Sequence, residues 1–100
     1  MKKIPPFYLT GTKMVSYTIP QNITSIDWSA FIDCNEFTNV TIPDSMTSIG
    51  DYAFERCEEL TRINFKGTIS QWNKIKLDPM WKTDSLQLKE IKCTDGTVIL

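Results

Sequence analysis

Apolar and polar residues alternate over two short stretches of the chain. The first covers residues 40–42, with the sequence Val-Thr-Ile, and the second covers residues 63–65, with the sequence Ile-Asn-Phe. Because successive side chains of a strand point to opposite faces, this pattern predicts two short strands, each with one buried and one exposed face. Pro43 follows the first strand and is expected to end it, since proline has no backbone N–H for a ladder.

The two predicted strands belong to a longer repeat. Residues 17–39 align without a gap on residues 40–62, at an offset of 23 residues. Both copies place alanine and phenylalanine at the same positions, Ala30-Phe31 and Ala53-Phe54. A fixed period of this length is typical of a solenoid, in which each repeat forms one coil that stacks on the next. We therefore predict an α/β solenoid, a short right-handed coil with about two full repeats.

Each repeat is also predicted to carry a short helical segment. Residues 28–35 and 51–58 hold Ala, Phe and Cys at positions i, i+1 and i+4, a spacing that suits one or two helical turns on the outside of the coil. Gly50 precedes the second segment, and we expect it to adopt a backbone conformation that other residues avoid. Cys34 and Cys57 share one repeat position, which predicts a buried stripe of reduced thiols rather than a disulfide.

The N-terminal end departs from the repeat but keeps part of its pattern. Subtracting 23 residues places Tyr8 at the position of Phe31 and Gly11 at the position of Cys34. The cysteine stripe is therefore not expected to reach this far. Residues 1–16 are predicted to be a degraded half-repeat that caps the N-terminal end of the stack, since terminal repeats are atypical.

After the second predicted strand the period stops, and the rest of the chain is predicted to form a C-terminal cap. Apolar residues at helical spacing in 68–77 predict a helix that ends at Asp78-Pro79. The sequence of residues 86–100 predicts a β-hairpin around Asp95-Gly96. The expected parts of this single domain are the N-terminal cap at 1–16, the repeats at 17–66 and the helix-plus-hairpin cap at 67–100.

The repeat resembles those of the BspA-like leucine-rich repeat family, the Treponema type with a period of about 23 residues. Residues 37–42 and 60–65 carry the L-x-x-L-x-L core of a leucine-rich repeat. The longer string that carries the resemblance is Ile42-Pro43, Met46, Ile49-Gly50, Ala53-Phe54, Cys57, Leu60 and Ile63. Residues 65–96 are similar to the C-terminal cap that often follows such repeats. The resemblance implies a bacterial, phage or protist protein that acts in adhesion and protein binding, often at a cell surface, and it brings no catalytic residues.

Composition removes most classes of enzyme. The chain has no histidine and no glycine-rich phosphate loop, which excludes the usual hydrolase triads and histidine metal sites. Glu36, Glu58 and Glu59 could gather on adjacent coils, but the ligand spacing of a calcium loop is missing. We therefore expect no enzyme, no cofactor and no metal.

Charge is distributed unevenly along the chain. Residues 27–59 carry eight acids and one base, whereas seven bases and four acids follow them. An acidic repeat body argues against a nucleic acid as the ligand. No apolar run follows Lys2 and Lys3, so we expect no signal peptide, no membrane insertion and a cytoplasmic protein. A place on a virion or cell surface is left open for a chain that belongs to a larger assembly.

The outward-facing residues of the strands form the predicted binding surface. Since the apolar residues of each strand must face the core, their neighbours must point outward and line up across the coils. The predicted partner-binding residues are Thr18, Asn39, Thr41, Arg62 and Asn64, with Trp28 as a separate candidate. Trp28 is a candidate because the next repeat has Asp51 in its place, so the repeat itself does not require an aromatic residue there.

Two functions fit this surface. The first is a non-catalytic protein–protein interaction module that binds one protein partner, such as a phage-encoded inhibitor or adaptor. The alternative is a structural or adhesion component of a virion or cell surface that self-associates. A flat polar face suits a protein or glycan better than a small molecule, which favours a concave apolar pocket. A monomer fits the first hypothesis and a homo-oligomer fits the second.

Overall fold

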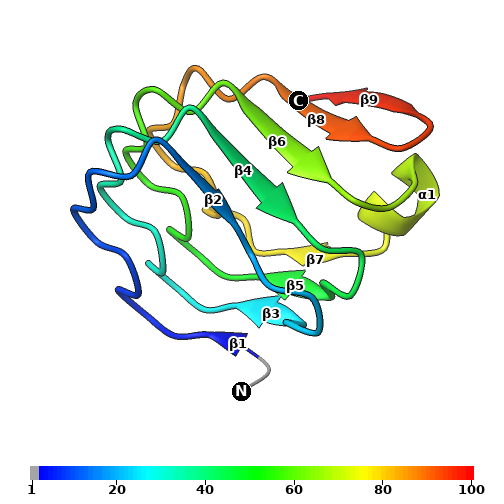
Figure 1. Ribbon diagram of the computed structural model, residues 1–100, viewed down its shortest axis with the longest axis horizontal. Helices are drawn as coiled ribbons and strands as arrows, with labels where there is room; N and C mark the ends of the chain where they lie inside the picture. The colour runs from blue at the N-terminus through cyan, green and yellow to red at the C-terminus, as the bar shows by residue number, and fades with distance from the viewer. Residues whose placement is uncertain (1–2) are drawn as a thin grey trace.

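The computed structural model describes residues 3–100, which form two β-sheets and, within that range, one short helix (Figure 1). The first sheet has the strand order β1 (Lys3–Ile4), β3 (Ser25–Ile26), β5 (Ser48–Ile49) and β7 (Lys76–Leu77). The second sheet has the order β2 (Ser16–Thr18), β4 (Asn39–Ile42), β6 (Arg62–Phe65), β8 (Glu90–Cys93) and β9 (Gly96–Ile99). The helix α1 spans Ile69–Trp72. Residues 1–2 of the predicted N-terminal cap lie outside the described residues.

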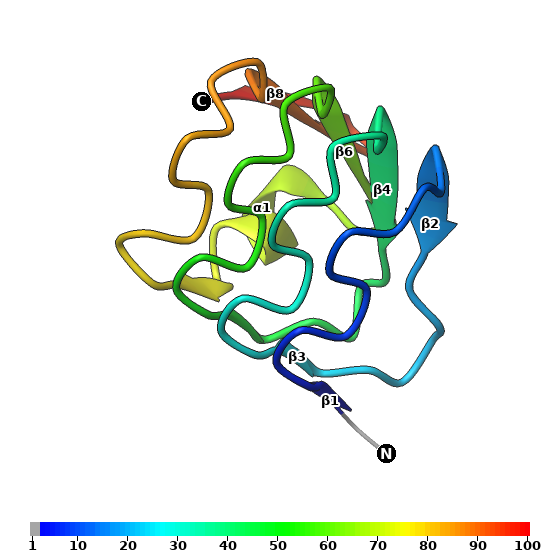
Figure 2. The ribbon, with the colours of Figure 1, turned by 90° about the vertical axis from the view of Figure 1, so that its left-hand side faces the viewer.

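The chain visits the two sheets alternately, so that neighbouring strands of a sheet lie one repeat apart in sequence. In the second sheet, Asn39 of β4 lies opposite Ser16 of β2 and Arg62 of β6, and both pairings are parallel. These registers confirm the predicted 23-residue offset and the two predicted strands. Figure 2 shows the turns of successive repeats side by side. The first sheet was not predicted, because each of its strands is only two residues long.

The core fills the space between the two sheets. The apolar strand residues Val40, Ile42 and Ile63 are fully buried, as the alternation predicted. Phe31 and Phe54, which occupy one repeat position, stack with ring centroids 5.3 Å apart and an interplanar angle of 22°. Because equivalent side chains stack on one another, the core runs without interruption from the first described coil to the last.

The predicted helical segments 28–35 and 51–58 are wrong. Both segments are turns, in which Ser29 and Asp33 have left-handed backbones with φ of 54° and 60°. Their N–H groups donate sideways to the next coil, as from Ser29 to the Asp51 carbonyl at 3.0 Å. A donor used between coils is lost to the i→i−4 ladder of a helix. The described fold is therefore almost entirely β, and the α/β part of the predicted class is not supported.

Gly50 does not adopt the unusual backbone conformation that was predicted for it. The φ angle of Gly50 is not positive, unlike those of Gly11 and Gly96. A Cβ atom at this position would instead lie 2.8 Å from the backbone nitrogen of Trp28 in the preceding coil. Glycine is therefore needed here because two backbones approach closely.

The chain does not leave the repeat after β6, contrary to the prediction. Lys76 lies opposite Ser48, and Glu90 lies opposite Arg62, so a further coil follows at an offset of 28 residues. The difference of 28 − 23 = 5 residues is an insertion between β6 and β7, and it contains α1. The predicted helix over 68–77 is accordingly shorter than expected, since its last two residues belong to β7.

The predicted hairpin is confirmed, and it fastens the insertion. Strands β8 and β9 pair in antiparallel, with Cys93 opposite Gly96. The carboxylate of Asp95, in the turn between them, accepts a hydrogen bond of 2.9 Å from the N–H of Ile69. Thr68 caps α1 by accepting from the Gln71 N–H at 3.1 Å, and the Gln71 side chain accepts from Thr68 in return.

The N-terminal coil follows the repeat with one residue fewer. Strand β1 pairs with β3 at an offset of 22 residues, since Ile4 lies opposite Ile26. The thiol of Cys34 donates to the Leu9 carbonyl, as the thiol of Cys57 donates to that of Phe31. Leu9 is therefore the structural equivalent of Phe31. The predicted equivalences of Tyr8 with Phe31 and of Gly11 with Cys34 were off by one residue.

Candidate protein-binding surface

The outward-facing residues of β2, β4, β6 and β8 form two straight rows across the second sheet, which we name the ladder. The first row is Ser16, Asn39, Arg62 and Glu90, and the second row is Thr18, Thr41, Asn64 and Lys92. The structure thus brings the five predicted strand residues onto one face. Glu90 and Lys92 were missed, because the 28-residue offset places them in the repeat only after the insertion is recognised.

Burial alternates along the strands that carry the ladder. Val40 and Ile63 point into the core and are fully buried, whereas Thr41 and Asn64 are half-buried and Arg62 is exposed. Parallel strands lie about 4.8 Å apart, so the ladder presents one polar group at each such step.

Arg62 lies at the centre of the first row, between Asn39 and Glu90. Its side chain is exposed, and among residues 3–100 it makes no ion pair. The ion pairs of the described chain join Lys3 to Asp27 and Arg56 to Asp33 instead. The guanidinium donors of Arg62 are therefore available for an external carboxylate or carbonyl group.

Backbone hydrogen bonds join the residues that precede β2, β4 and β6 across the coils. The Thr38 N–H donates to the Val15 carbonyl at 2.7 Å, and the Thr61 N–H donates to the Thr38 carbonyl at 3.3 Å. The side-chain amide of Asn39 donates to the Thr38 hydroxyl at 3.2 Å. This network fixes the side chain of Asn39 at the start of the first row.

Trp28 lies apart from the ladder, in the turn that follows β3 of the first sheet. Its side chain is 49% exposed and packs edge-to-face on Phe7, with ring centroids 5.1 Å apart. Phe7, Tyr52 and Met80 are also exposed, and the Tyr52 N–H donates to the Met80 carbonyl at 2.8 Å. We name these four exposed residues of successive turns the turn stripe, and the sequence indicated Trp28 alone.

The outer side of the first sheet carries a shallow groove of about 310 Å³. It is lined by Lys3, Ser25, Ile26, Asp27, Ser48, Ile49, Gly50, Lys76 and Asp78. The Lys3 Nζ atom lies 3.6 Å from Asp27 Oδ2, so one of the two lysines that line the groove is already paired with an acid. The groove is small, and its charges are mixed.

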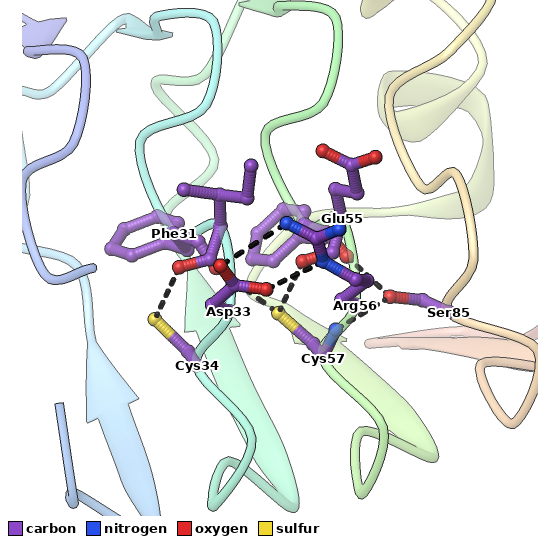
Figure 3. Close-up of polar contacts among 9 residues, drawn as sticks. Phe31, Asp33, Cys34, Glu55, Arg56, Cys57 and Ser85 are labelled. Carbon is purple, nitrogen blue, oxygen red and sulfur yellow. Dashed lines mark hydrogen bonds and ion pairs between the residues drawn. The ribbon is translucent and has the colours of Figure 1, made fainter. Parts of the chain in front are cut away.

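Cys34 and Cys57 form a buried stripe in neighbouring coils (Figure 3). Cys34 and Cys57 are free and fully buried, as predicted, and Cys93 is also free. A hydrogen bond with the Cys34 thiol, together with burial, raises the pKa of the Cys57 thiol. Beside the stripe, Arg56 reaches back one coil to Asp33, with an Nε–Oδ1 distance of 2.6 Å. This contact ties one turn to the next at the surface.

Within residues 3–100, no cluster of three or more histidine, cysteine or acidic residues is arranged to hold a metal ion. None of the described helices has the length and apolar character needed to cross a membrane. No curated protein and no solved structure matches the chain. The sequence model of the BspA-type leucine-rich repeat region, described with six copies, matches residues 2–95, and the chain therefore belongs to that family.

Proposed function

We propose that this BspA-type leucine-rich repeat protein is a non-catalytic interaction module whose ladder binds a protein partner. Leucine-rich repeats of this kind generally mediate protein–protein interaction or adhesion, and they are typically non-catalytic. The observation that supports the ladder is its register, which aligns polar side chains from four parallel strands in two rows. In this proposal the chain is a short solenoid whose last coil, with β7 and β8, follows the insertion and is closed by the β8–β9 hairpin.

The shape of the ladder favours a protein partner. Two shallow pockets of residues 3–100 lie away from the ladder, one on the first sheet and one around Glu58, Asp84 and Leu86. A standard interface takes about 800 Å² from each partner. The ladder is short, so an interface of that size would also take in the residues around it.

Arg62 is the proposed anchor of the interface. Arginine is enriched among the residues that dominate binding energy, and its planar group suits two-point contact with a carboxylate. Asn39 and Asn64 lie beside Arg62 on β4 and on β6 and can add hydrogen bonds to a partner's backbone. Glu90 on the other side of Arg62 would repel a strongly acidic partner, which favours one of mixed charge such as an adaptor's target or an enzyme to be inhibited.

The test starts from a partner captured by pull-down and identified by mass spectrometry. Arg62→Ala and Asn39→Ala should each weaken its binding about tenfold or more, which is about 1.4 kcal/mol. The melting temperature should stay within a few degrees of the parent's, because both substitutions remove surface side chains. Lys74→Ala, an exposed lysine away from the ladder, is the matched control and should bind like the parent.

Trp28 is the second proposed contact, and the same experiment separates it from the ladder. If Arg62→Ala and Asn39→Ala bind like the parent while Trp28→Ala abolishes binding, the turn stripe is the binding surface and the ladder proposal is wrong. Trp28→Ala should otherwise change affinity less than Arg62→Ala.

A further inference from the structure

The four outer edges of the two sheets are protected to very different degrees. β1 carries Lys3, and β7 carries Lys76, so both edges of the first sheet present a charge. The β2 edge of the second sheet is only three residues long. The β9 edge has the sequence Gly-Thr-Val-Ile, without charge or proline, over four residues. Natural sheets usually guard such an edge, because its unpaired backbone groups accept a further strand.

The direction of the β9 backbone groups follows from its pairing with β8. The Leu100 N–H donates to the Lys89 carbonyl at 2.9 Å, which makes these two residues a hydrogen-bonded pair. Hydrogen-bonded and non-hydrogen-bonded pairs alternate in an antiparallel ladder. Val98 is therefore bonded to β8, whereas the backbone N–H and C=O groups of Thr97 and Ile99 point toward the free edge.

The side chains of β9 differ in exposure according to the face of the sheet to which they point. Val98 is half-buried against the core, while Thr97 and Ile99 point outward and are exposed. Ile99 has 75% of its surface exposed. The edge strand of a soluble protein usually carries a charged residue at such a position. Figure 1 shows β9 at the end of its sheet, with α1 next to the turn rather than along the outer edge.

We propose that β9 pairs in antiparallel with β9 of a second copy of this chain. A two-fold axis at Val98 would place Thr97 opposite Ile99 of the partner subunit, so that every outward N–H and C=O of these residues finds a partner. The strand has no charge that would meet itself across the axis. Two-fold dimers of this isologous kind are the commonest oligomers. The two five-stranded sheets would then form one continuous sheet.

A homo-oligomer was expected for the self-associating alternative, but a dimer through β9 is also compatible with partner binding by the ladder. The rows begin on β2 and end on β8, the strand next to β9, and a strand added at the β9 edge extends the sheet without covering its outer face. Pairing through β9 therefore leaves the ladder open and presents it twice. A failure of the dimer would leave the partner-binding experiment unaffected, and the reverse also holds.

Sedimentation equilibrium of the full chain from about 10 µM to about 1 mM tests the proposal, since small interfaces are weak. The parent should show a reversible monomer–dimer equilibrium. Thr97→Pro removes an outward N–H without breaking a bond to β8, and Ile99→Lys adds a guarding charge; each should weaken the dimer at least tenfold. Ser16→Lys places the same charge on the β2 edge and should dimerise like the parent. Circular dichroism checks that all variants fold.

Amide hydrogen exchange gives a readout that is specific to this edge. The N–H groups of Thr97 and Ile99 should exchange quickly in dilute protein and become protected as concentration rises, while Val98 stays protected throughout. A parent that is monomeric over the whole range would overturn the proposal. So would a dimer that both variants retain, one that Trp28→Ala dissolves, or one in which the amides of Thr97 and Ile99 stay unprotected.

Discussion

One small hydrogen-bonding side chain closes each coil against the coil before it. The thiol of Cys34 donates to the Leu9 carbonyl at 3.2 Å, and that of Cys57 donates to the Phe31 carbonyl at 3.2 Å. The hydroxyl of Ser85 donates to the Phe54 carbonyl in the same way. Serine and cysteine thus share one role here, which is to satisfy a buried carbonyl in little space. This repeat position requires a small side chain that can donate a hydrogen bond, and either a hydroxyl or a thiol meets that requirement.

The Ser85 hydroxyl makes this role testable. It also accepts from the Cys57 N–H at 3.0 Å, so Ser85→Ala leaves both a buried donor and a buried acceptor without partners. The free energy of unfolding should fall by about 1–3 kcal/mol. Urea denaturation measures this loss, with Ser70→Ala, an exposed serine of α1, as the control. Ser85→Cys should restore most of the stability. If Ser85→Ala is as stable as the parent, the hydrogen bonds do not hold the coils together.

At the scale of elements, the insertion that contains α1 explains what the sequence could and could not predict. The alternation in β4 and β6 and the Asp95-Gly96 turn signal were sufficient to predict two strands and the hairpin. The last coil was missed because five extra residues shift its phase. The string Ser85-x-x-Leu88-x-x-Ile91 repeats Cys57-x-x-Leu60-x-x-Ile63, and reading serine as a replacement for cysteine would have revealed it.

The false helices have a different cause. The spacing of Ala30, Phe31 and Cys34 fits a helix and a tight turn equally well. What decides between them is the partner of each N–H, and the Phe31 N–H bonds to the Ala53 carbonyl of the next coil at 2.8 Å. A contact between coils cannot be inferred from the spacing within one coil. For the same reason the sequence predicted the ladder through β6 but not its continuation onto Glu90 and Lys92.

The insertion should be essential to the fold, and Trp72 is the residue that tests this. Its side chain is 3% exposed and packs on Phe65 and Trp81, with ring centroids 5.4 Å and 6.1 Å away. Trp72→Ala should lower the free energy of unfolding by about 3–5 kcal/mol, because it leaves a large cavity. That loss is a large part of the stability of a small domain.

Trp28 supplies the matched control for this experiment. Trp28→Ala removes the same kind of side chain from a half-exposed position and should cost much less. Thermal unfolding followed by circular dichroism compares the two variants. A Trp72→Ala variant that melts within a few degrees of the parent would mean that α1 contributes little to the stability of the core.

At the scale of the whole molecule, stability is a property of the stack rather than of any one coil. Strand pairs β2–β4, β4–β6 and β6–β8 each join segments one repeat apart, so among the ladder strands only β8 has a partner close to it in sequence, which is β9. In stacked repeats each unit interacts only with its neighbours, and a long array can unfold in parts. This stack is short, and its core continues from Ile4 to Cys93. Losing one coil exposes the apolar face of the next.

The stack should therefore unfold in a single transition. Trp28→Phe leaves Trp72 and Trp81 as the only tryptophans, so fluorescence of this variant reports on the last coil. Far-UV circular dichroism reports on all the strands together, and the exchange of the Val40 amide reports on β4. The first two probes should give one urea midpoint, as a two-state domain requires, and Val40 should exchange only through global unfolding. A fluorescence midpoint clearly separate from that of circular dichroism would show that the last coil and its insertion unfold on their own, and the core would then be two units rather than one.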